Sequence, residues 1–438
     1  MNLKVLTFLI ALGVASLTSS AQTFTKLDQY FDLLEKHDKF MGSVAVSKQG
    51  QVIYRRSVGF SHLKTKSKID ENTKFRVGSI TKTFTAVLTF KAIEEGKLQL
   101  TQTINRYFPQ LKNADKITIH HLLAHRSGIF NFTARNDYLT WHTQPKTKSE
   151  LLQIIEEGGN IFEPGQKAEY SNANYVLLSL ILEDLYQKKF GEIVEESILR
   201  PLQLTNSALG EQIQVAKNEA KSYRYFGSWL EEPETHMSIP RGAGALVSTP
   251  TDLVIFADAL FSGKLISLAS LENMTNMQDG YGAGLFPIPF YQLQGFGHSG
   301  GIDGFSSFFC HFPTGDVSYA ITSNGANFPL NDINIAVLSS VYDRPFDLPS
   351  FEKIDVSEEE LEQLMGVYAS AQLPLKITIS RNQKTLIAQA SGQPAFSLEA
   401  LGNNKFKFDQ AGVLMEFQPT EKTLVLKQGG GQFLFKKE

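Results

Sequence analysis

The alternation of apolar and polar positions divides the chain into a strand-containing start, a helical middle and a return to strands. Apolar residues recur at helical spacing over Leu27–Lys36 and again over Ser79–Glu95, and Gly96 stands where the second helix should end. Two alternating runs between these helices predict a β-hairpin, Gly42–Ser47 with Gln51–Arg56. The middle of the chain then shows helical patterns, at Ile117–Leu123, Lys148–Glu157, Asn172–Leu185 and Thr251–Leu260.

Strand patterns return after this helical middle. They cover Ser306–Phe312 and Val317–Ser323, and a helical pattern over Asp332–Val341 follows them. Strands from both ends of the sequence can join one sheet, and the helices between them then form an insertion. We therefore predict an α/β fold, with a mixed antiparallel sheet flanked by helices and an inserted all-helical subdomain.

The last part of the chain has a different pattern. After a linker-like segment, Asp343–Pro349, short runs of period two alternate with glycine turns. Examples of these runs are Leu375/Ile377/Ile379, Phe406/Phe408, Leu424/Leu426 and Phe433/Phe435. About eight such runs fit, enough for a small closed or half-closed β-barrel. We predict two domains, residues 22–345 and 346–438, and expect the second, which has no histidine or cysteine, to have a covering or stabilising role without chemistry.

The first residues predict export. Lys4 precedes an apolar stretch, Val5–Leu17, and small residues at 19–21 complete the pattern of a cleavable secretory signal over residues 1–21. The apolar stretch is shorter than the ~20 residues that a membrane span needs, although an uncleaved anchor is the alternative. We expect a mature bacterial protein that begins near Gln22, is periplasmic or secreted, and has no integral membrane segment after signal cleavage.

Composition excludes several classes of protein. The 438 residues are 42% hydrophobic and 20% charged, which is typical of a globular chain rather than a disordered, collagenous or disulfide-stapled one. The formal net charge of −3 and the lack of a long basic run argue against a nucleic-acid partner. The single cysteine, Cys310, lies in a strand pattern, and we interpret it as core because the adjacent His311 would point to the opposite face.

The first candidate for chemistry is a Ser-x-x-Lys motif at the start of a strong helical pattern, Ser79 with Lys82. Spacing i,i+3 places both side chains on one face of the helix. Burial and the positive helix end lower the pKa of such a lysine, so that it can accept the serine proton. The motif also occurs at Ser61/Lys64 and Ser350/Lys353, but these lie in a polar turn region and in the linker, so the context selects Ser79.

A second motif, Tyr-x-Asn, follows a Pro-Gly turn and leads into a helix. In an extended segment the side chains of Tyr170 and Asn172 point the same way and can reach one cleft. A phenol near a lysine can relay protons, and an amide can bind a substrate carbonyl. Without the other motifs, the simpler interpretation would be a turn tyrosine and a helix cap at Asn172.

A third motif, Gly297-His298-Ser299-Gly300-Gly301, precedes a strand pattern. His298 and Gly300 would share one face, and a glycine there leaves room for substrate backbone beside the strand. The N–H groups of Gly301 and Ser79 could then form an oxyanion hole. The pentapeptide also matches the Gly-x-Ser-x-Gly nucleophile elbow, with Ser299 as nucleophile, but that elbow opens a helix and needs a later acid and histidine at workable distance, which this sequence does not offer.

With the three motifs in this order, the chain resembles the serine β-lactamase and penicillin-binding-protein family, on the branch of class C β-lactamases, D-alanyl-D-alanine carboxypeptidases and related esterases. The resemblance covers roughly residues 24 to 342 and includes supporting stretches at 121–128, 164–165 and 242–249. The tail from about Phe351 is similar to the lipocalin-like β domain often appended to such hydrolases. The resemblance thus implies a β-lactamase/transpeptidase-like fold, with the active-site cleft between the sheet and the helical domain.

The resemblance also implies a mechanism that needs no cofactor and no metal. Ser79 attacks the carbonyl of a small-molecule or peptide substrate, Lys82 and Tyr170 transfer protons, and water hydrolyses the acyl-enzyme, with Tyr170 as candidate for activating that water. Asn172 positions substrate, and the substrate-binding strand carries His298, Ser299 and Gly300. The bond cleaved would be an amide or ester of a cell-wall D-amino-acid peptide, a β-lactam or a small ester.

One departure from the family pattern concerns charge. Class C β-lactamases usually carry Lys-Thr-Gly where this chain has His298-Ser299-Gly300. A histidine of ordinary pKa ~6.5 is charged only part of the time near neutrality. We therefore expect a carboxypeptidase or esterase rather than a dedicated β-lactamase. We also expect substrates with a carboxylate to lose kcat/KM as the pH rises through the pKa of His298.

Two hypotheses of other kinds remain open. His121 and His125 are spaced i,i+4, but Leu122 replaces the glutamate of a His-Glu-x-x-His zinc motif, so we interpret them as structural. The protein could also be a catalytically inactive penicillin- or peptidoglycan-binding or sensing protein that keeps the fold. The presence of the serine, the lysine and the tyrosine together argues against that.

Overall fold

The computed structural model describes residues 24–351, 354–408 and 411–438, which form two compact units. The predicted signal peptide at residues 1–21 lies outside the described residues. Every helix in the described ranges is too short or too polar to cross a lipid bilayer.

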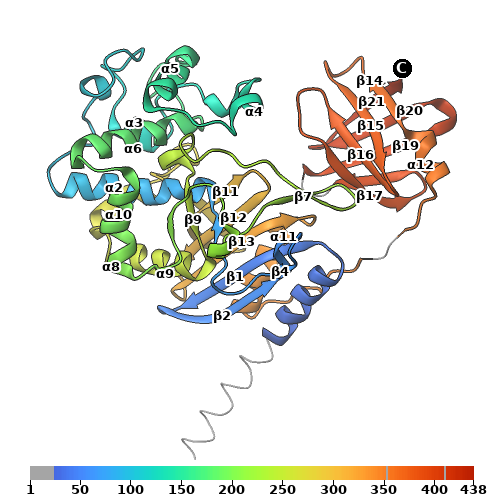
Figure 1. Cartoon of the computed structure of the whole chain (residues 1–438), viewed down its shortest axis with the longest axis horizontal. Helices are drawn as coiled ribbons and strands as arrows, with labels where there is room; N and C mark the ends of the chain where they lie inside the picture. Colours follow the sequence, from blue (N-terminus) through green and yellow to red (C-terminus); the bar gives the residue numbers. More distant parts are fainter. Residues whose placement is uncertain (1–23, 352–353, 409–410) are drawn as a thin grey trace, which may run out of the picture. The chain divides into compact units, whose positions relative to one another are not determined.

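The larger unit, residues 41–222 and 232–324, is built on a six-stranded sheet (Figure 1). The strand order is β10 (Phe286–Phe290), β11 (Leu293–Ile302), β12 (Phe305–Phe312), β13 (Val317–Ala326), β1 (Phe40–Lys48) and β2 (Gln51–Val58). Strand β1 is antiparallel to β2, and each strand from β10 to β13 is antiparallel to the next one. The sheet and the helices of this unit confirm the predicted α/β fold. The first hairpin therefore lies beside strands that come more than two hundred residues later, as the sequence pattern predicted.

The helices of this unit share one large hydrophobic core. Helix α2 (Thr81–Glu94) is buried almost all round, so its threonines must be hydrogen-bonded. The hydroxyl of Thr83 donates to Gly284 O and that of Thr85 to Gly242 O, each at 2.7 Å. The other helices are α3 (Ile119–Leu123), α4 (Tyr138–Trp141), α5 (Lys148–Gly158), α6 (Asn172–Tyr186), α7 (Phe190–Val194), α8 (Arg200–Leu202), α9 (Pro250–Phe261) and α10 (Leu268–Thr275).

A small three-stranded sheet leads into helix α2. Its order is β5 (Phe75–Arg76), β9 (Leu246–Ser248) and β6 (Ala208–Leu209), and a second small sheet pairs β3 (Phe60–His62) with β4 (Ser67–Lys68). Strand β5 is followed by a single 3₁₀ turn, η1 (Gly78–Ile80), which continues directly into α2. The predicted helix over Ser79–Glu95 therefore begins with a tighter turn than an α-helix has.

The smaller unit contains residues 24–40, 223–231 and 325–438, without the masked positions. It includes a helix over residues 24–36, the hairpin β7 (Tyr223–Tyr225) and β8 (Trp229–Glu231), α11 (Leu330–Val341) and α12 (Glu358–Leu364). This unit also contains residues 24–40, 223–231 and 325–345, which the sequence analysis placed in the first domain. The domain boundary at 345/346 stays a prediction.

The end of the chain forms a closed eight-stranded β-barrel (Figure 1). Pairing of the first strand with the last closes it, so no sheet edge is left open. Inward-facing apolar residues, such as Ile377, Leu386, Phe406 and Phe435, fill its core. This confirms the predicted small barrel. Its strands are β14 (Gly366–Ala369), β15 (Lys376–Asn382), β16 (Thr385–Ala390), β17 (Phe396–Gly402), β18 (Lys405–Phe408), β19 (Val413–Gln418), β20 (Thr423–Gln428) and β21 (Gly431–Lys437).

Candidate active site

The structure brings the serine, the lysine and the tyrosine of the first two motifs into one hydrogen-bonded group. Ser79, in η1, is half-buried, and its Oγ lies 3.0 Å from Lys82 Nζ and 2.8 Å from Tyr170 Oη. Tyr170 stands more than ninety residues away in sequence, just before α6. A nucleophile with two proton-transfer groups within hydrogen-bonding reach is the geometry that covalent catalysis requires.

Lys82 is fully buried, and burial holds the pKa of its ammonium well below the ordinary value. Its Nζ has three oxygen neighbours: Ser79 Oγ, and Asn172 Oδ1 and Ala243 O at 2.7 Å each. A neutral amine has two N–H donors and one lone pair. If the two N–H groups go to the two carbonyl oxygens, which can only accept, the lone pair is left for the serine hydroxyl. The arrangement therefore suits a lysine that acts as a base.

Tyr170 is held by aromatic neighbours. Its ring stacks on the buried imidazole of His125 at a centroid distance of 4.5 Å. The Nδ1 of His125 accepts a hydrogen bond from the N–H of Ser171 at 3.1 Å, which fixes the tyrosine backbone from the other side. Burial raises the pKa of the Tyr170 phenol, so the hydroxyl keeps its proton at neutral pH. A neutral Tyr170 phenol can therefore donate a proton, and the buried amine of Lys82 is the group suited to act as a base.

Asn172 begins helix α6 and faces the lysine rather than open space. Its Oδ1 accepts from Lys82, and its Nδ2 donates to Asn131 Oδ1 at 3.2 Å and to Thr133 Oγ1 at 3.0 Å. These contacts orient the amide and occupy both of its ends. The structure therefore supports a role for Asn172 in positioning Lys82, and the predicted direct contact with substrate would require one of these bonds to open.

The third motif lies on β11, against the turn that carries the nucleophile. A Cβ on Gly300 would lie 2.0 Å from Val77 O, and a Cβ on Gly78 would lie 2.9 Å from Gly301 N. Gly78 also has a φ of +49°, a conformation that favours glycine. The two backbones are in direct contact because neither has a side chain at this point. This contact supports the predicted oxyanion hole, made of the N–H groups of Ser79 and Gly301.

His298 is not the partly charged group that the sequence predicted. Only 2% of the residue is exposed, and its ring packs edge-on against Phe286 at a centroid distance of 4.7 Å. Burial lowers the pKa of His298 well below its ordinary value, so the imidazole is neutral at physiological pH. The expectation failed because strand alternation fixes which face a residue points to, but does not show what covers that face.

Sequence reasoning missed three residues that support the site. The sequence predicted only a structural role for His125, no motif pointed to Asn131, and Ala243 lay in a supporting stretch without a role. His121 has a different task from His125: its Nδ1 accepts from Thr118 N at 3.3 Å in a helix cap. The stretches 121–128 and 242–249 were the available signals, because both resembled the family pattern.

Metal-ligating side chains gather elsewhere in the described part of the chain. Asp258, His311 and Asp316 have ligand atoms within 4.8 Å of one another, and the Oδ1 of Asp258 accepts from the hydroxyls of Ser47 and Ser318.

The fold and this arrangement define a class of site: a serine hydroxyl within hydrogen-bonding reach of a buried lysine and a tyrosine. The sequence model of the family described as Beta-lactamase matches residues 27–341, and the chain belongs to that family. The prediction of a member of this family, and of an enzyme of the serine hydrolase type, is thereby confirmed at the level of the family.

Individual relatives agree with this assignment. The teichoic acid D-alanine hydrolase of Staphylococcus aureus (strain MRSA252) is 28% identical over 232 residues, which are 52% of this chain and 55% of that protein. The chain thus spans about half the length of the curated relatives that it matches.

Among solved structures, the D-amino acid amidase of Ochrobactrum anthropi SV3 in complex with D-phenylalanine has the same fold. It has a TM-score of 0.65 and 24% identity, over 72% of this chain and 98% of that chain. The octameric penicillin-binding protein homologue from Pyrococcus abyssi has a TM-score of 0.63 and 21% identity, over 94% of this chain and 100% of that chain.

Proposed function

We propose that this protein is an exported serine hydrolase that cleaves an amide or ester bond through an acyl-enzyme on Ser79. The observation that carries the proposal is the position of Ser79 Oγ, 3.0 Å from the buried amine of Lys82 and 2.8 Å from the phenol of Tyr170. The barrel, which has no histidine or cysteine, is assigned no part in this chemistry.

In the acylation step, neutral Lys82 takes the proton of Ser79 while the oxygen attacks the substrate carbonyl. The negative oxygen of the tetrahedral intermediate is stabilised by the N–H groups of Ser79 and Gly301. Tyr170 donates its proton to the leaving amine or alcohol and is reprotonated by Lys82. Asn172 and the carbonyl of Ala243 hold the lysine in place during this exchange.

In the second step, water attacks the acyl-enzyme. Tyr170 and Lys82 together accept one proton from this water and pass it to the oxygen of Ser79 when the acid product leaves. The pair thus returns to its starting state with a neutral amine and a neutral phenol. Acylation and hydrolysis of the acyl-enzyme thus use the same groups, and no further side chain is needed as a base.

For the substrate class we propose D-aminoacyl amides and esters, in preference to β-lactam antibiotics. The relatives named above include a D-amino acid amidase and a teichoic acid D-alanine hydrolase. The neutral His298 replaces the permanent positive charge that a lysine would offer to a substrate carboxylate. A substrate without a free carboxylate beside the scissile bond is therefore favoured.

A turnover panel tests this assignment. It compares a D-alanine amide, a short-chain ester, a D-alanyl-D-alanine peptide and a cephalosporin, with the L-alanine amide as matched control. We expect the highest kcat/KM on the D-amide or the ester and the lowest on the cephalosporin. If no compound is turned over while a labelled penicillin still binds, the protein is a binding or sensing protein, and the proposal is wrong.

The burial of His298 also changes the expected pH dependence. A D-alanyl-D-alanine peptide and its C-terminal amide differ only in the terminal charge. Their kcat/KM values should follow the same profile from about pH 5 to about pH 8, the range in which a histidine of ordinary pKa titrates and His298 does not. Steady-state kinetics of both peptides measure this. A loss confined to the carboxylate peptide above about pH 6.5 would show that His298 is charged in the enzyme.

Export is proposed from the pattern of residues 1–21. N-terminal sequencing of protein recovered from the periplasm or medium should begin near Gln22. A chain that still begins at Met1 would contradict cleavage of the signal.

A further inference from the structure

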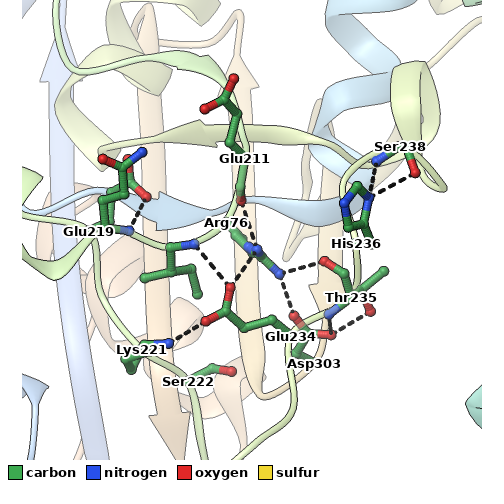
Figure 2. Close-up of polar contacts among 12 residues, drawn as sticks. Arg76, Glu211, Glu219, Lys221, Ser222, Glu234, Thr235, His236, Ser238 and Asp303 are labelled. Carbon is green, nitrogen blue, oxygen red and sulfur yellow. Dashed lines mark hydrogen bonds and ion pairs between the residues drawn. The ribbon is translucent and has the colours of Figure 1, made fainter. Parts of the chain in front are cut away.

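A buried arginine lies three residues before the nucleophile. Arg76, in β5, has a side chain that is 2% exposed, and Figure 2 shows it at the centre of a polar network. Its Nη1 donates to Asp303 Oδ2 at 2.8 Å and to Thr235 O at 3.0 Å. Its Nη2 donates to Glu211 O at 3.0 Å and to Glu234 Oε2 at 3.2 Å. One planar side chain therefore joins β5 to three other segments of the same unit.

Asp303 is the partner that connects this network to the third motif. It lies in the two-residue turn between β11 and β12, where Ile302 pairs with Phe305, and it has a φ of +54°. Its Oδ1 accepts from the N–H and the hydroxyl of Thr235, at 3.0 and 2.6 Å, and its side chain is 2% exposed. Both carboxylate oxygens are thus occupied, and the turn is fixed two residues after Gly301.

The charges of the network cancel. Glu234 binds Lys221 as well as Arg76, and it accepts a further hydrogen bond from the N–H of Ile213 at 3.0 Å. Two cations and two carboxylates are therefore arranged in one chain, Lys221–Glu234–Arg76–Asp303 (Figure 2). A charge-balanced set of this kind resists rearrangement, since moving one member leaves the Arg76 or Asp303 charge buried without its partner.

The two ends of the Arg76–Asp303 ion pair flank the predicted oxyanion hole. Arg76 precedes Ser79 by three residues, and Asp303 follows Gly301 by two. Between these points the backbones of Gly78 and Gly301 touch without a side chain, and the hydroxyl of Ser307 donates to Val77 O at 2.8 Å. The distance between the N–H groups of Ser79 and Gly301 therefore depends on groups that lie beside this backbone contact. Among these groups, the Arg76–Asp303 ion pair is the charged one.

We propose that Arg76 and Asp303 are positioning residues that set the spacing of the oxyanion-hole N–H groups of Ser79 and Gly301. The inference rests on the proposed function, since it assigns these two N–H groups to a tetrahedral intermediate. An oxyanion hole acts because its donors are already in place when charge develops, and displacement of a reacting group by about 1 Å can cost 10²-fold in rate. The ion pair supplies that rigidity from outside the site.

Two variants test the proposal, Asp303→Asn and Arg76→Lys. Asparagine keeps an oxygen for Thr235 and tolerates the positive φ, but it presents no charge to Arg76. Lysine keeps the charge of Arg76 but cannot bind four acceptors from one plane. For a p-nitrophenyl ester we expect kcat to fall about 10- to 100-fold in Asp303→Asn, with KM changed less than about 3-fold, and a smaller loss in Arg76→Lys.

The control is Asp258→Asn, which neutralises another carboxylate, half-buried, whose partners are Ser47 and Ser318. It should leave kcat unchanged. The readout specific to positioning is the affinity for phenylboronic acid, which forms a tetrahedral adduct on the serine and places an oxygen in the hole. We expect the inhibition constant to rise in Asp303→Asn in parallel with the loss of kcat, and to stay unchanged in Asp258→Asn.

The outcomes separate this inference from the proposed function. A normal kcat and a normal boronate affinity in folded Asp303→Asn and Arg76→Lys would overturn the positioning role. A fall in melting temperature without a loss of kcat or of boronate affinity would reduce the ion pair to a structural contact and would overturn it too. Boronate binding that survives Ser79→Ala would instead contradict the proposed function itself.

Discussion

Replacing Ser79 by alanine should abolish hydrolysis of p-nitrophenyl esters, with a loss of kcat/KM of at least about 10⁴-fold. The variant removes one oxygen from a half-buried position and leaves Lys82 and Tyr170 in place. Without that oxygen the amine and the phenol can transfer protons, but no group remains to form the acyl-enzyme. Steady-state hydrolysis, with the melting temperature as a check on folding, measures the effect.

The matched control for this variant is Ser61→Ala. Ser61 belongs to another Ser-x-x-Lys match, Ser61/Lys64, but its hydroxyl donates to the backbone oxygens of Ser67 and Lys68. Its replacement should leave kcat/KM unchanged. If Ser79→Ala stays active while Ser299→Ala is inactive, the nucleophile-elbow interpretation is correct and the present assignment is wrong.

Replacing Lys82 by methionine should lower kcat by about 10³-fold or more, because the serine then has no base. Lys82→Arg should be equally inactive, since an arginine keeps a positive charge but cannot lose its proton. Activity retained by the arginine variant would show that Lys82 acts by its charge. The wild-type enzyme should also lose kcat/KM as the pH falls through the lowered pKa of Lys82, because the protonated amine cannot accept the serine proton.

The effect of Lys82→Met on stability separates lost chemistry from lost folding. Methionine removes a buried amine, which favours the folded state, but it leaves Asn172 Oδ1 and Ala243 O without their donor. These two effects oppose each other, so we expect the free energy of unfolding to change by less than about 2 kcal/mol. Denaturant unfolding of both proteins measures it, and a larger loss would assign the inactivity to misfolding.

Local spacing in the sequence was enough to find the serine and the lysine. Residues i and i+3 share a helix face whatever the rest of the fold does, and Lys82 indeed reaches Ser79. The barrel was predictable for a similar reason, since period-two runs and glycine turns are local signals. The convergence of Tyr170 on the same serine was a hypothesis about distant segments, and it depended on the order of the three motifs.

Other features depend on burial and on long-range contacts, which a single sequence does not show. Helix α2 has buried residues on every side, including four threonines, so its pattern did not reveal how deeply it lies. The burial of His298 overturned its expected charge. The ion pair of Arg76 with Asp303 joins residues 227 positions apart, and no local pattern connects them.

The central claim, a covalent intermediate on Ser79, is tested most directly by mass spectrometry. Wild-type protein is mixed with an activated D-alanyl ester or a labelled penicillin, quenched in acid, weighed intact and digested. We predict one added acyl group, located on the peptide that contains Ser79, lost with time as the substrate is turned over, and never formed in Ser79→Ala. An acyl group on any other residue, or turnover by the Ser79→Ala protein, would contradict the account.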